Sequence, residues 1–356
     1  MCNRVPARCR RRIKKHIRGE MMSSIARLRC LSSLLLSVLF GMTAAQAVVP
    51  AKIVYVRPVP QNDDAFLQQG TKGVEQAATM YQLQASTLES QPNQASRQQQ
   101  LDNAVKQGAK IVVMIGYEFK ELAASAARAA PQTRFVIMQH CVDNSPPNLT
   151  CVTFRESEPS YLAGMEAALT TSSNKVGMIG PIDSPLKRKN GEAFAAGAKA
   201  VNSAITVHAP LWVGGTQPFD DPSRAEAQAK TMLGDGVDVI FAAASGSNRG
   251  IFKALSTQPK AKAIGSDINQ CSLAPGRILD NVQTHADTAI SVAVGLLMGG
   301  STATHMDFGM KEGAVSLTGL GLDAAYSECD ILRQRPAIEK LRVAKNAIIR
   351  GTLKVD

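Results

Sequence analysis

The sequence contains one tryptophan and lacks any segment in which basic and aromatic residues alternate. Such segments bind single-stranded nucleic acid, because bases stack on the rings while cations contact the phosphates. The formal net charge of the 356 residues is nevertheless +11. Ten of the 40 lysines and arginines fall within residues 1–47 beside a single acid, Glu20, which leaves 30 basic and 28 acidic residues. The rest of the chain is therefore nearly neutral, and we expect no nucleic-acid partner.

Common enzyme signatures are also absent. The sequence has no Gly-x-Ser-x-Gly elbow, no Walker loop and no His-Glu-x-x-His. Two pairs of neighbouring carboxylates, Asp63 with Asp64 and Asp220 with Asp221, could hold a cation or act as acid and base on a glycosidic bond. Asp221 before Pro222, however, is typical of a helix start. We expect a protein that is not an enzyme and uses no cofactor; a nucleoside-processing hydrolase is the alternative of another class.

Metal-binding spacings such as Cys-x-x-Cys are missing, so we expect no metal site. Of the seven cysteines, three lie within residues 1–47 and four lie beyond it. Cys141 and Cys151 flank the turn-rich segment VDNSPPNLT, which predicts a disulfide between two strand ends. A second disulfide, Cys271–Cys329, follows mainly by elimination. Free buried thiols are the alternative.

Residues 1–47 combine a basic extension with the pattern of a secretory signal. An apolar run, LSSLLLSVLF at 31–40, follows two arginines and precedes the small residues Ala45 and Ala47. This order predicts export to the periplasm, with cleavage near Ala47. An uncleaved anchor is the alternative, because the apolar region approaches the length that spans a bilayer.

From Lys52 onward, short β-branched runs alternate with alanine-rich amphipathic segments. The predicted strands are 52–56, 81–86, 109–116, 133–139 and 151–154 in a first series, and 175–180, 205–213, 237–243 and 261–266 in a second. The predicted helices lie near 64–80, 94–107, 117–130, 184–202, 221–235 and 246–257. Near-continuous apolar strands are typical of parallel sheets covered by helices on both faces. Two such series predict an α/β fold of two Rossmann-like lobes, joined by a tight hinge because no long flexible linker separates them.

Ligands of open α/β sheets bind beyond the carboxyl ends of the strands. The segments that follow the predicted strands are rich in Asp, Asn, Gln, Ser, Gly and single aromatic residues, among them Tyr117 and Gln139. Carboxylates and amides bind hydroxyls and amines, and rings stack on flat molecules. The sequence therefore predicts a small, neutral, hydroxylated ligand.

Several segments carry a pattern that extends over most of the chain. The run FRESEPSYLAGMEAALTTSSNKVGMIG at 154–180 contains Phe-x-Glu, Leu-Ala-Gly and Lys-Val-Gly-x-x-Gly. The others are FDDPSRAEAQA at 219–229, GVDVIFAAASGSNRGIF at 236–252, AIGSDINQ at 263–270 and the closing segment 337–355. Together they resemble the basic membrane protein family of ABC-transporter substrate-binding proteins. That family has the type I periplasmic-binding-protein fold, and one of its branches binds purine nucleosides.

The resemblance implies roles for three residues of the second lobe. Phe219 would stack on the base, Gly246 would allow close approach of the sugar, and Asp267 would accept hydrogen bonds from ribose hydroxyls. Asp267 could instead be a local cap. For the lobes, we predict 48–155 with about 280–312 as the N-terminal lobe, and 156–279 with about 313–356 as the C-terminal lobe.

In the first lobe, the resemblance places Phe66 as the opposing ring, preceded by Asp63 and Asp64. Tyr117 and Gln139 complete the predicted ligand-binding set. Phe66 could instead begin an amphipathic helix that packs inward. The family commonly has Asp where this chain has Gln139, a departure that bears on the identity of the ligand and not on the fold.

These observations predict a periplasmic solute-binding protein of an ABC importer. We expect it to bind a purine nucleoside or related base in the cleft between its lobes, to act with an inner-membrane ABC permease and to be a monomer. A sugar-binding receptor of the same fold is the alternative, because sugars would use the same aromatic platforms.

Overall fold

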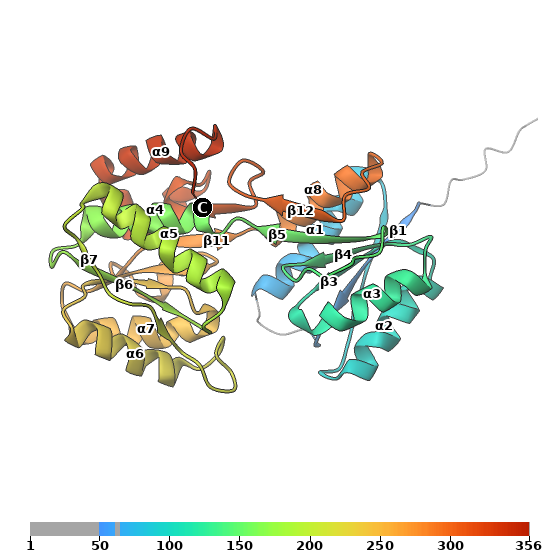
Figure 1. Ribbon diagram of the computed structural model, residues 1–356, viewed down its shortest axis with the longest axis horizontal. Coiled ribbons are helices and arrows are strands. Elements are labelled where there is room, and N and C mark those ends of the chain that lie inside the picture. Colours follow the sequence, from blue (N-terminus) through green and yellow to red (C-terminus); the bar gives the residue numbers. More distant parts are fainter. Residues whose placement is uncertain (1–49, 61–64, 356) are drawn as a thin grey trace, which may run out of the picture. The chain divides into compact units, whose positions relative to one another are not determined.

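Two β-sheets organise the chain in the computed structural model, which describes residues 50–60 and 65–355 (Figure 1). The predicted signal region, Asp63 and Asp64 lie outside the described residues. Across the described ranges, no helix has both the length and the apolar character needed to cross a membrane.

The first sheet is six-stranded and entirely parallel, in the order β12-β5-β4-β3-β1-β2. Its strands are β1 (Lys52–Arg57), β2 (Gln84–Glu89), β3 (Ala109–Ile115), β4 (Arg134–Met138), β5 (Leu149–Phe154) and β12 (His305–Phe308). Helices α1 (Ala65–Tyr81) and α8 (Ala286–Met298) cover one face, and α2 (Gln94–Lys106) and α3 (Lys120–Ala129) cover the other (Figure 1).

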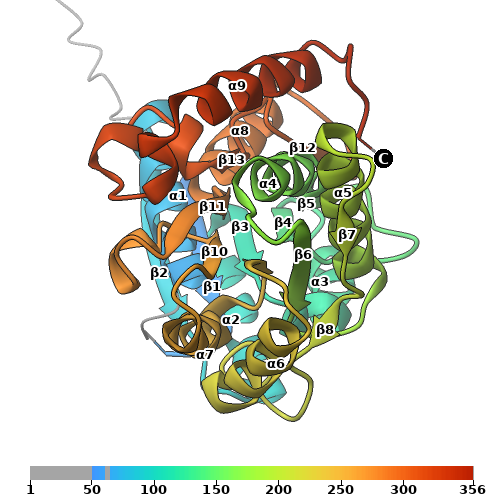
Figure 2. The same ribbon diagram turned by 90° about the vertical axis from the view of Figure 1, so that its left-hand side faces the viewer.

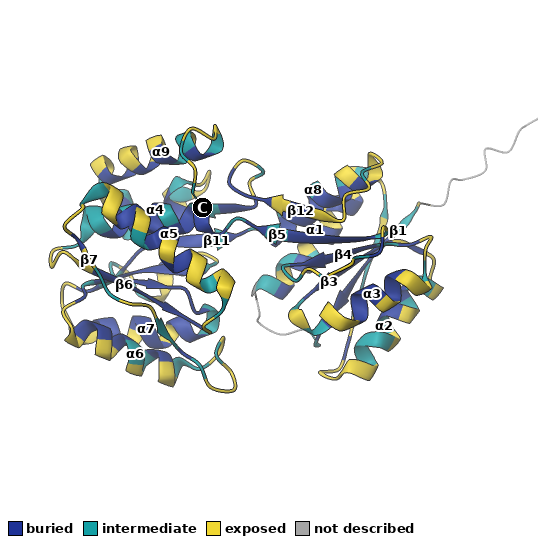
Figure 3. Ribbon diagram, in the orientation of Figure 1, coloured by how far each residue is buried: buried dark blue, intermediate teal, exposed yellow. Residues whose placement is uncertain are grey.

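Alternation along β1 explains why this sheet is covered twice. Ile53 and Tyr55 belong to the core beneath α1 and α8, whereas Val54 and Val56 belong to the core beneath α2 and α3. All four side chains are fully buried, because successive side chains of a strand point to opposite faces of the sheet. Figure 3 shows the buried residues along the strands and on the inward sides of the helices.

The second sheet has the order β13-β11-β10-β9-β6-β7, with β8 also paired to β6, and only β13 runs antiparallel to its neighbour. Its strands are β6 (Lys175–Gly180), β7 (Thr206–Val207), β8 (Leu211–Trp212), β9 (Val239–Ala242), β10 (Lys262–Asp267), β11 (Ile278–Thr284) and β13 (Val315–Leu317). Helices α6 (Pro222–Gly234) and α7 (Asn248–Ala254) lie on one side, and α4 (Ser157–Thr170), α5 (Pro185–Val201) and α9 (Arg335–Ile349) lie on the other (Figures 1 and 2).

Two strand predictions were wrong in detail. The predicted strand 81–86 starts too early, because α1 continues to Tyr81 and Gln82 then takes a left-handed φ of 55° before β2 begins. The predicted strand 205–213 is interrupted between β7 and β8, where Pro210 lies. Proline cannot donate a ladder hydrogen bond, so a continuous strand is broken there.

Within the described residues, the chain passes between the sheets three times: after β5, after β11 and after β12. Strand β11 pairs with β10 and β13 of the second sheet. The return to the first sheet therefore follows Thr284, and the segment 280–284, which the prediction assigned to the N-terminal lobe, belongs to the second sheet. Strand β11 escaped prediction because the buried polar residues Asp280 and Asn281 interrupt its apolar pattern.

Both predicted disulfides are confirmed. Cys141–Cys151 joins the segment after β4 to β5, with a Cα–Cα distance of 5.1 Å. Cys271–Cys329 joins segments 58 residues apart, with a Cα–Cα distance of 5.0 Å. The longer bridge ties the end of β10 to the segment that precedes α9.

Candidate functional site

Three strand ends carry a non-glycine residue in the left-handed region. Gln139 follows β4 with φ 68°, Ser245 follows β9 with φ 55°, and Asp267 ends β10 with φ 70°. Such conformations cost of order 1–3 kcal/mol and persist only where surrounding structure holds them, frequently at ligand sites. Gln139 and Asp267 are two of the residues that the sequence predicts to contact the ligand.

A buried amide network holds the strand ends of β9 and β10. Asn248 is fully buried, and its Nδ2 donates to Ser266 Oγ and Gln270 Oε1, each at 3.0 Å. Its Oδ1 accepts from the backbone N–H of Ala244 at 2.9 Å. The network links the turn after β9 to the end of β10, immediately before Asp267. The sequence pointed to the post-strand segments 244–248 and 267–270, which contain both amides, but only the paired strands show that Asn248 and Gln270 meet.

Phe219 and Gly246, two residues of the predicted ligand-binding set, lie on segments that contact each other. The carbonyl of Phe219 accepts a hydrogen bond from the backbone N–H of Ser247 at 3.1 Å. A Cβ atom added to Gly246 would lie 3.0 Å from that carbonyl oxygen, so the close approach of the two segments favours glycine. The ring of Phe219 remains 44% exposed. Asp221 caps α6 by accepting from the backbone N–H of Arg224, as its position before a proline predicts.

A buried ion pair lies at the same edge of the second sheet. Lys187, in the first turn of α5, follows β6, and its Nζ is 2.9 Å from Glu156 Oε2. Asn190 donates to the same oxygen at 2.6 Å. Burial alone would raise the pKa of Glu156, but the charge of Lys187 and these hydrogen bonds outweigh it and lower the pKa. The sequence missed this set, because Glu156 and Lys187 meet only in the folded chain.

Lys187 also lies within the electrostatic reach of Asp267. Burial alone would lower the pKa of the Lys187 ammonium, but the carboxylates of Glu156 and Asp267 raise it. A partly buried lysine with two acidic neighbours stays charged at neutral pH. The edge of the second sheet therefore combines one ammonium with two carboxylates.

The first sheet presents rings at its own strand ends. Tyr117, which follows β3, is 66% exposed, and its ring lies edge to face with His140 at a centroid distance of 6.2 Å. Burial and the charge of Lys120 lower the pKa of His140. Phe66, near the start of α1, meets Phe154 edge to face at 6.4 Å and packs partly against the core. Phe66 therefore has the packing role that the sequence left open, and a part in ligand binding stays a prediction.

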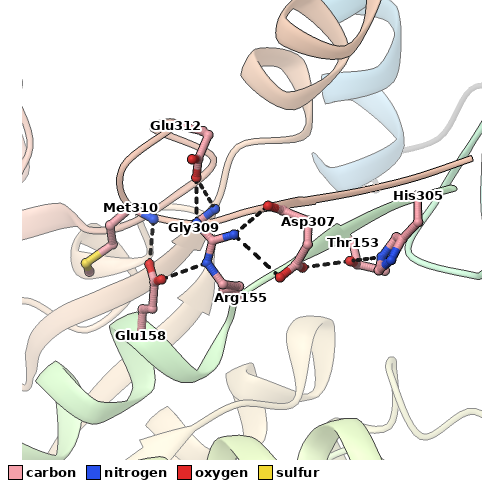
Figure 4. Close-up of polar contacts among 8 residues, drawn as sticks. All are labelled: Thr153, Arg155, Glu158, His305, Asp307, Gly309, Met310 and Glu312. Carbon is pink, nitrogen blue, oxygen red and sulfur yellow. Dashed lines mark hydrogen bonds and ion pairs between the residues drawn. The ribbon is translucent and has the colours of Figure 1, made fainter. Parts of the chain in front are cut away.

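Charged side chains join the segment where the chain leaves the first sheet after β5 to the segment where it leaves that sheet after β12 (Figure 4). Arg155, after β5, pairs through Nε with Glu158 at 2.8 Å and through Nη2 with Glu312 at 2.7 Å. It also donates to the carbonyl of Asp307 in β12. Glu158 in turn accepts from the backbone N–H of Met310 at 2.7 Å. The crossing after β11 is bonded to the crossing after β12, because the backbone N–H of His285 donates to the carbonyl of Ala314 at 2.8 Å.

The sulfurs of Cys141 and Cys151 and a ring nitrogen of His305 lie within 4.8 Å of one another. The arrangement resembles a metal-ligand set only in composition. Both sulfurs are joined in the disulfide, so neither is the thiolate that a metal ion requires. His305 is instead 2.8 Å from the hydroxyl of Thr153.

Two surface depressions lie away from the strand ends. One, of about 290 Å³, is lined by Leu169 of α4 and by residues around the start of α9. The other, of about 750 Å³, lies between the second half of α1 and α8. Neither is lined by a residue of the predicted ligand-binding set, so their volumes do not bear on it.

Known proteins resemble the chain over nearly all of its described length. The profile of a family described as Bmp, ABC transporter substrate-binding protein PnrA-like, matches residues 51–355. The ABC transporter nucleoside-binding protein BmpA of Lactococcus lactis is 30% identical over 318 residues, which cover 83% of this chain and 85% of that protein. The CD4+ T-cell-stimulating antigen of Listeria innocua is 26% identical over 316 residues, or 83% and 84% of the two chains.

The fold has solved counterparts. A solute-binding protein of an ABC transporter system from Aeropyrum pernix superposes with a TM-score of 0.67 at 20% identity, covering 86% of this chain and 93% of that one. A likeness at this identity concerns the fold. The predicted two-lobed α/β fold of periplasmic binding proteins is thereby confirmed.

Proposed function

Because the chain belongs to the Bmp family of PnrA-like ABC transporter substrate-binding proteins, we propose that its ligand is a purine nucleoside or a related base. A protein of this family binds a small molecule, acts with a membrane permease and is a receptor rather than an enzyme. The proposal includes export to the periplasm through the segment that ends near Ala47, and action as a monomer.

One observation carries the nucleoside proposal. Phe219 is half exposed, and its backbone carbonyl accepts a hydrogen bond from the turn after β9. Asp267 lies at the end of the adjacent strand β10. A flat base needs a ring to stack on, and ribose hydroxyls need a carboxylate that accepts hydrogen bonds. The name of the Lactococcus lactis relative as a nucleoside-binding protein agrees with this pairing of groups.

The proposed mechanism is closure of the two lobes on the ligand. Phe219, Gly246 and Asp267 bind from the second lobe, and Phe66, Tyr117 and Gln139 bind from the first. A ligand that contacts both lobes shifts the population toward a closed form, which the permease recognises. The three crossings act as the hinge.

A thermal-shift screen of the purified chain from residue 48 onward tests the proposal. The screen includes purine and pyrimidine nucleosides, free bases, sugars and amino acids. Ligand linkage predicts stabilisation of about 2.7 kcal/mol at a hundredfold excess over Kd. We expect purine nucleosides to raise Tm. A rise with sugars alone contradicts the proposal and supports the sugar-binding alternative, while release of free base from inosine would indicate a hydrolase.

Two variants locate the binding site. Phe219→Ala and Asp267→Ala should each abolish most of the nucleoside-dependent rise in Tm, since the first removes the stacking ring and the second the hydroxyl acceptor. Tyr326→Ala and Asp143→Ala, which change exposed residues of matching chemistry elsewhere, should leave the rise intact. Equal responses of all four variants would show that the ligand binds at another site.

A further inference from the structure

The ion pair of Lys187 with Glu156 is placed where the proposed ligand binds. Glu156 follows β5 at the first crossing, and Lys187 follows β6 in the second sheet. Strand β6 pairs with β9, and β9 pairs with β10, which ends at Asp267. Because these strands are parallel, their carboxyl ends share one edge, and Lys187 lies at the same edge as Asp267.

The hydrogen bonds of Lys187 leave donors available. An ammonium group has three N–H donors, and Glu156 Oε2 accepts one of them at 2.9 Å. Asn190 also binds that oxygen, so the carboxylate is held in place and fixes the ammonium in turn. The side chain of Lys187 keeps 19% of its surface exposed against 8% for Glu156, so the lysine is the member of the pair that a ligand can reach.

The charges at this edge suit a hydroxylated ligand. A hydroxyl group both donates and accepts hydrogen bonds. Asp267 can accept from it, but a carboxylate has no proton to donate. Lys187, whose ammonium lies within the electrostatic field of Asp267, supplies the missing donor. Two neighbouring hydroxyls on one ring would satisfy both groups at once.

We infer that Lys187 is a specificity-determining residue, which donates to a ribose hydroxyl oxygen while Asp267 accepts from the same pair of hydroxyls. The inference rests on the proposed function and deepens it, because it makes the vicinal diol a requirement for tight binding. Lys187 would therefore select ribonucleosides over deoxynucleosides and free bases.

Isothermal titration with inosine, 2′-deoxyinosine and 3′-deoxyinosine tests the inference. The variants are Lys187→Met and, as the matched control, Lys189→Met, whose exposed side chain lies on the same helix. A hydrogen bond to a charged group corresponds to about a tenfold to hundredfold change in Kd. With Lys187→Met, we expect inosine to lose affinity by this factor. The deoxy analogue that lacks the bonded hydroxyl should lose less than threefold. Lys189→Met should leave the affinity for all three ligands unchanged.

Removal of Lys187 leaves Glu156 buried without its cation, so Lys187→Met/Glu156→Gln is measured in parallel to keep the protein folded. The same selective loss is expected in the double variant. Equal affinity of wild type and this double variant for inosine overturns the inference alone. An equal loss for all three ligands also overturns it, since a general electrostatic role would not distinguish hydroxyls. Wild type that binds none of the three contradicts the proposed function, and the inference with it.

Discussion

At the residue scale, burial decides the chemistry of two carboxyls in the second lobe, Glu166 on α4 and Asp280 on β11. Asp280 Oδ1 accepts from the backbone N–H groups of Gly319 and Asn281, each at 2.7 Å. In the part of the chain that the structure describes, Asp280 Oδ2 and both oxygens of Glu166 have no hydrogen-bond partner. Burial raises the pKa of Asp280 to about 7, and burial together with the charge of Asp280 raises that of Glu166.

These raised pKa values predict a stability that falls as the pH rises. The unfolded chain loses the proton of Asp280 near its ordinary value of 3.8, whereas the folded chain keeps it to about pH 7. The folded state thus binds more protons between these values, and its stability decreases through this window. The contribution is fully present at low pH and lost above the folded pKa.

Glu166→Gln should stabilise the protein at pH 8 and change little at pH 5. Glutamine has the shape of the protonated acid but cannot ionise, so the buried charge is avoided. We expect a gain of about 1–3 kcal/mol at pH 8, measured by urea unfolding at both pH values. Glu192→Gln, at an exposed position of α5, is the control and should have no such pH-dependent effect. A gain of the same size at both pH values would contradict the assignment.

At the element scale, glycines allow helices α4 and α5 to pack with their backbones in contact. A Cβ atom on Gly164 would lie 1.9 Å from the carbonyl oxygen of Phe194, and one on Gly197 would lie 1.9 Å from that of Tyr161. No side chain can give way there, because the obstacle is backbone. This contact sets α4, which follows Glu156, against α5, which carries Lys187, and so fixes the ion pair.

Gly164→Ala should therefore destabilise the protein by about 3 kcal/mol or more, since overpacking against backbone forces the helices apart. Gly234→Ala is the matched control, because Gly234 is also helical and a Cβ there meets nothing within 4 Å. It should be neutral or stabilise by about 0.5–1 kcal/mol. Urea unfolding of both variants measures the difference. Similar changes in the free energy of unfolding for the two variants would mean that α4 and α5 can move apart without loss of stability.

At the scale of the whole molecule, covalent bridges and charged crossings connect segments far apart in the sequence. Arg155 joins the crossing after β5 to the crossing after β12 through its bonds to Glu158, Glu312 and the carbonyl of Asp307. The disulfide Cys271–Cys329 joins two segments 58 residues apart, and the chain between them passes through α8 and β12 of the first lobe. The disulfide Cys141–Cys151 spans 10 residues within the first lobe.

The loop lengths predict unequal contributions to stability. The chain-entropy relation gives about 4 kcal/mol for Cys271–Cys329 and about 3 kcal/mol for Cys141–Cys151. The double variant Cys271→Ala/Cys329→Ala should lose more free energy of unfolding than Cys141→Ala/Cys151→Ala, also because both sulfurs of the former are buried while Cys141 is exposed. Urea unfolding under oxidising conditions compares the two. A larger loss for the shorter bridge would contradict this order.

The pattern of residues by itself determined the α/β class, the two lobes, both disulfides and the family. The fold class, the lobes and the family depend on local patterns, such as the alternation of β-branched runs with alanine-rich segments and the run at 154–180. The disulfides depend on the cysteines beyond residue 47 and their spacing, and Cys271–Cys329 followed by elimination. Only the tertiary structure decided the strand order, the place of β11, and the contacts of Glu156 with Lys187 and of Asn248 with Gln270. Those partners lie on different strands or helices, and no local pattern in a single sequence records which strand ends fold against each other.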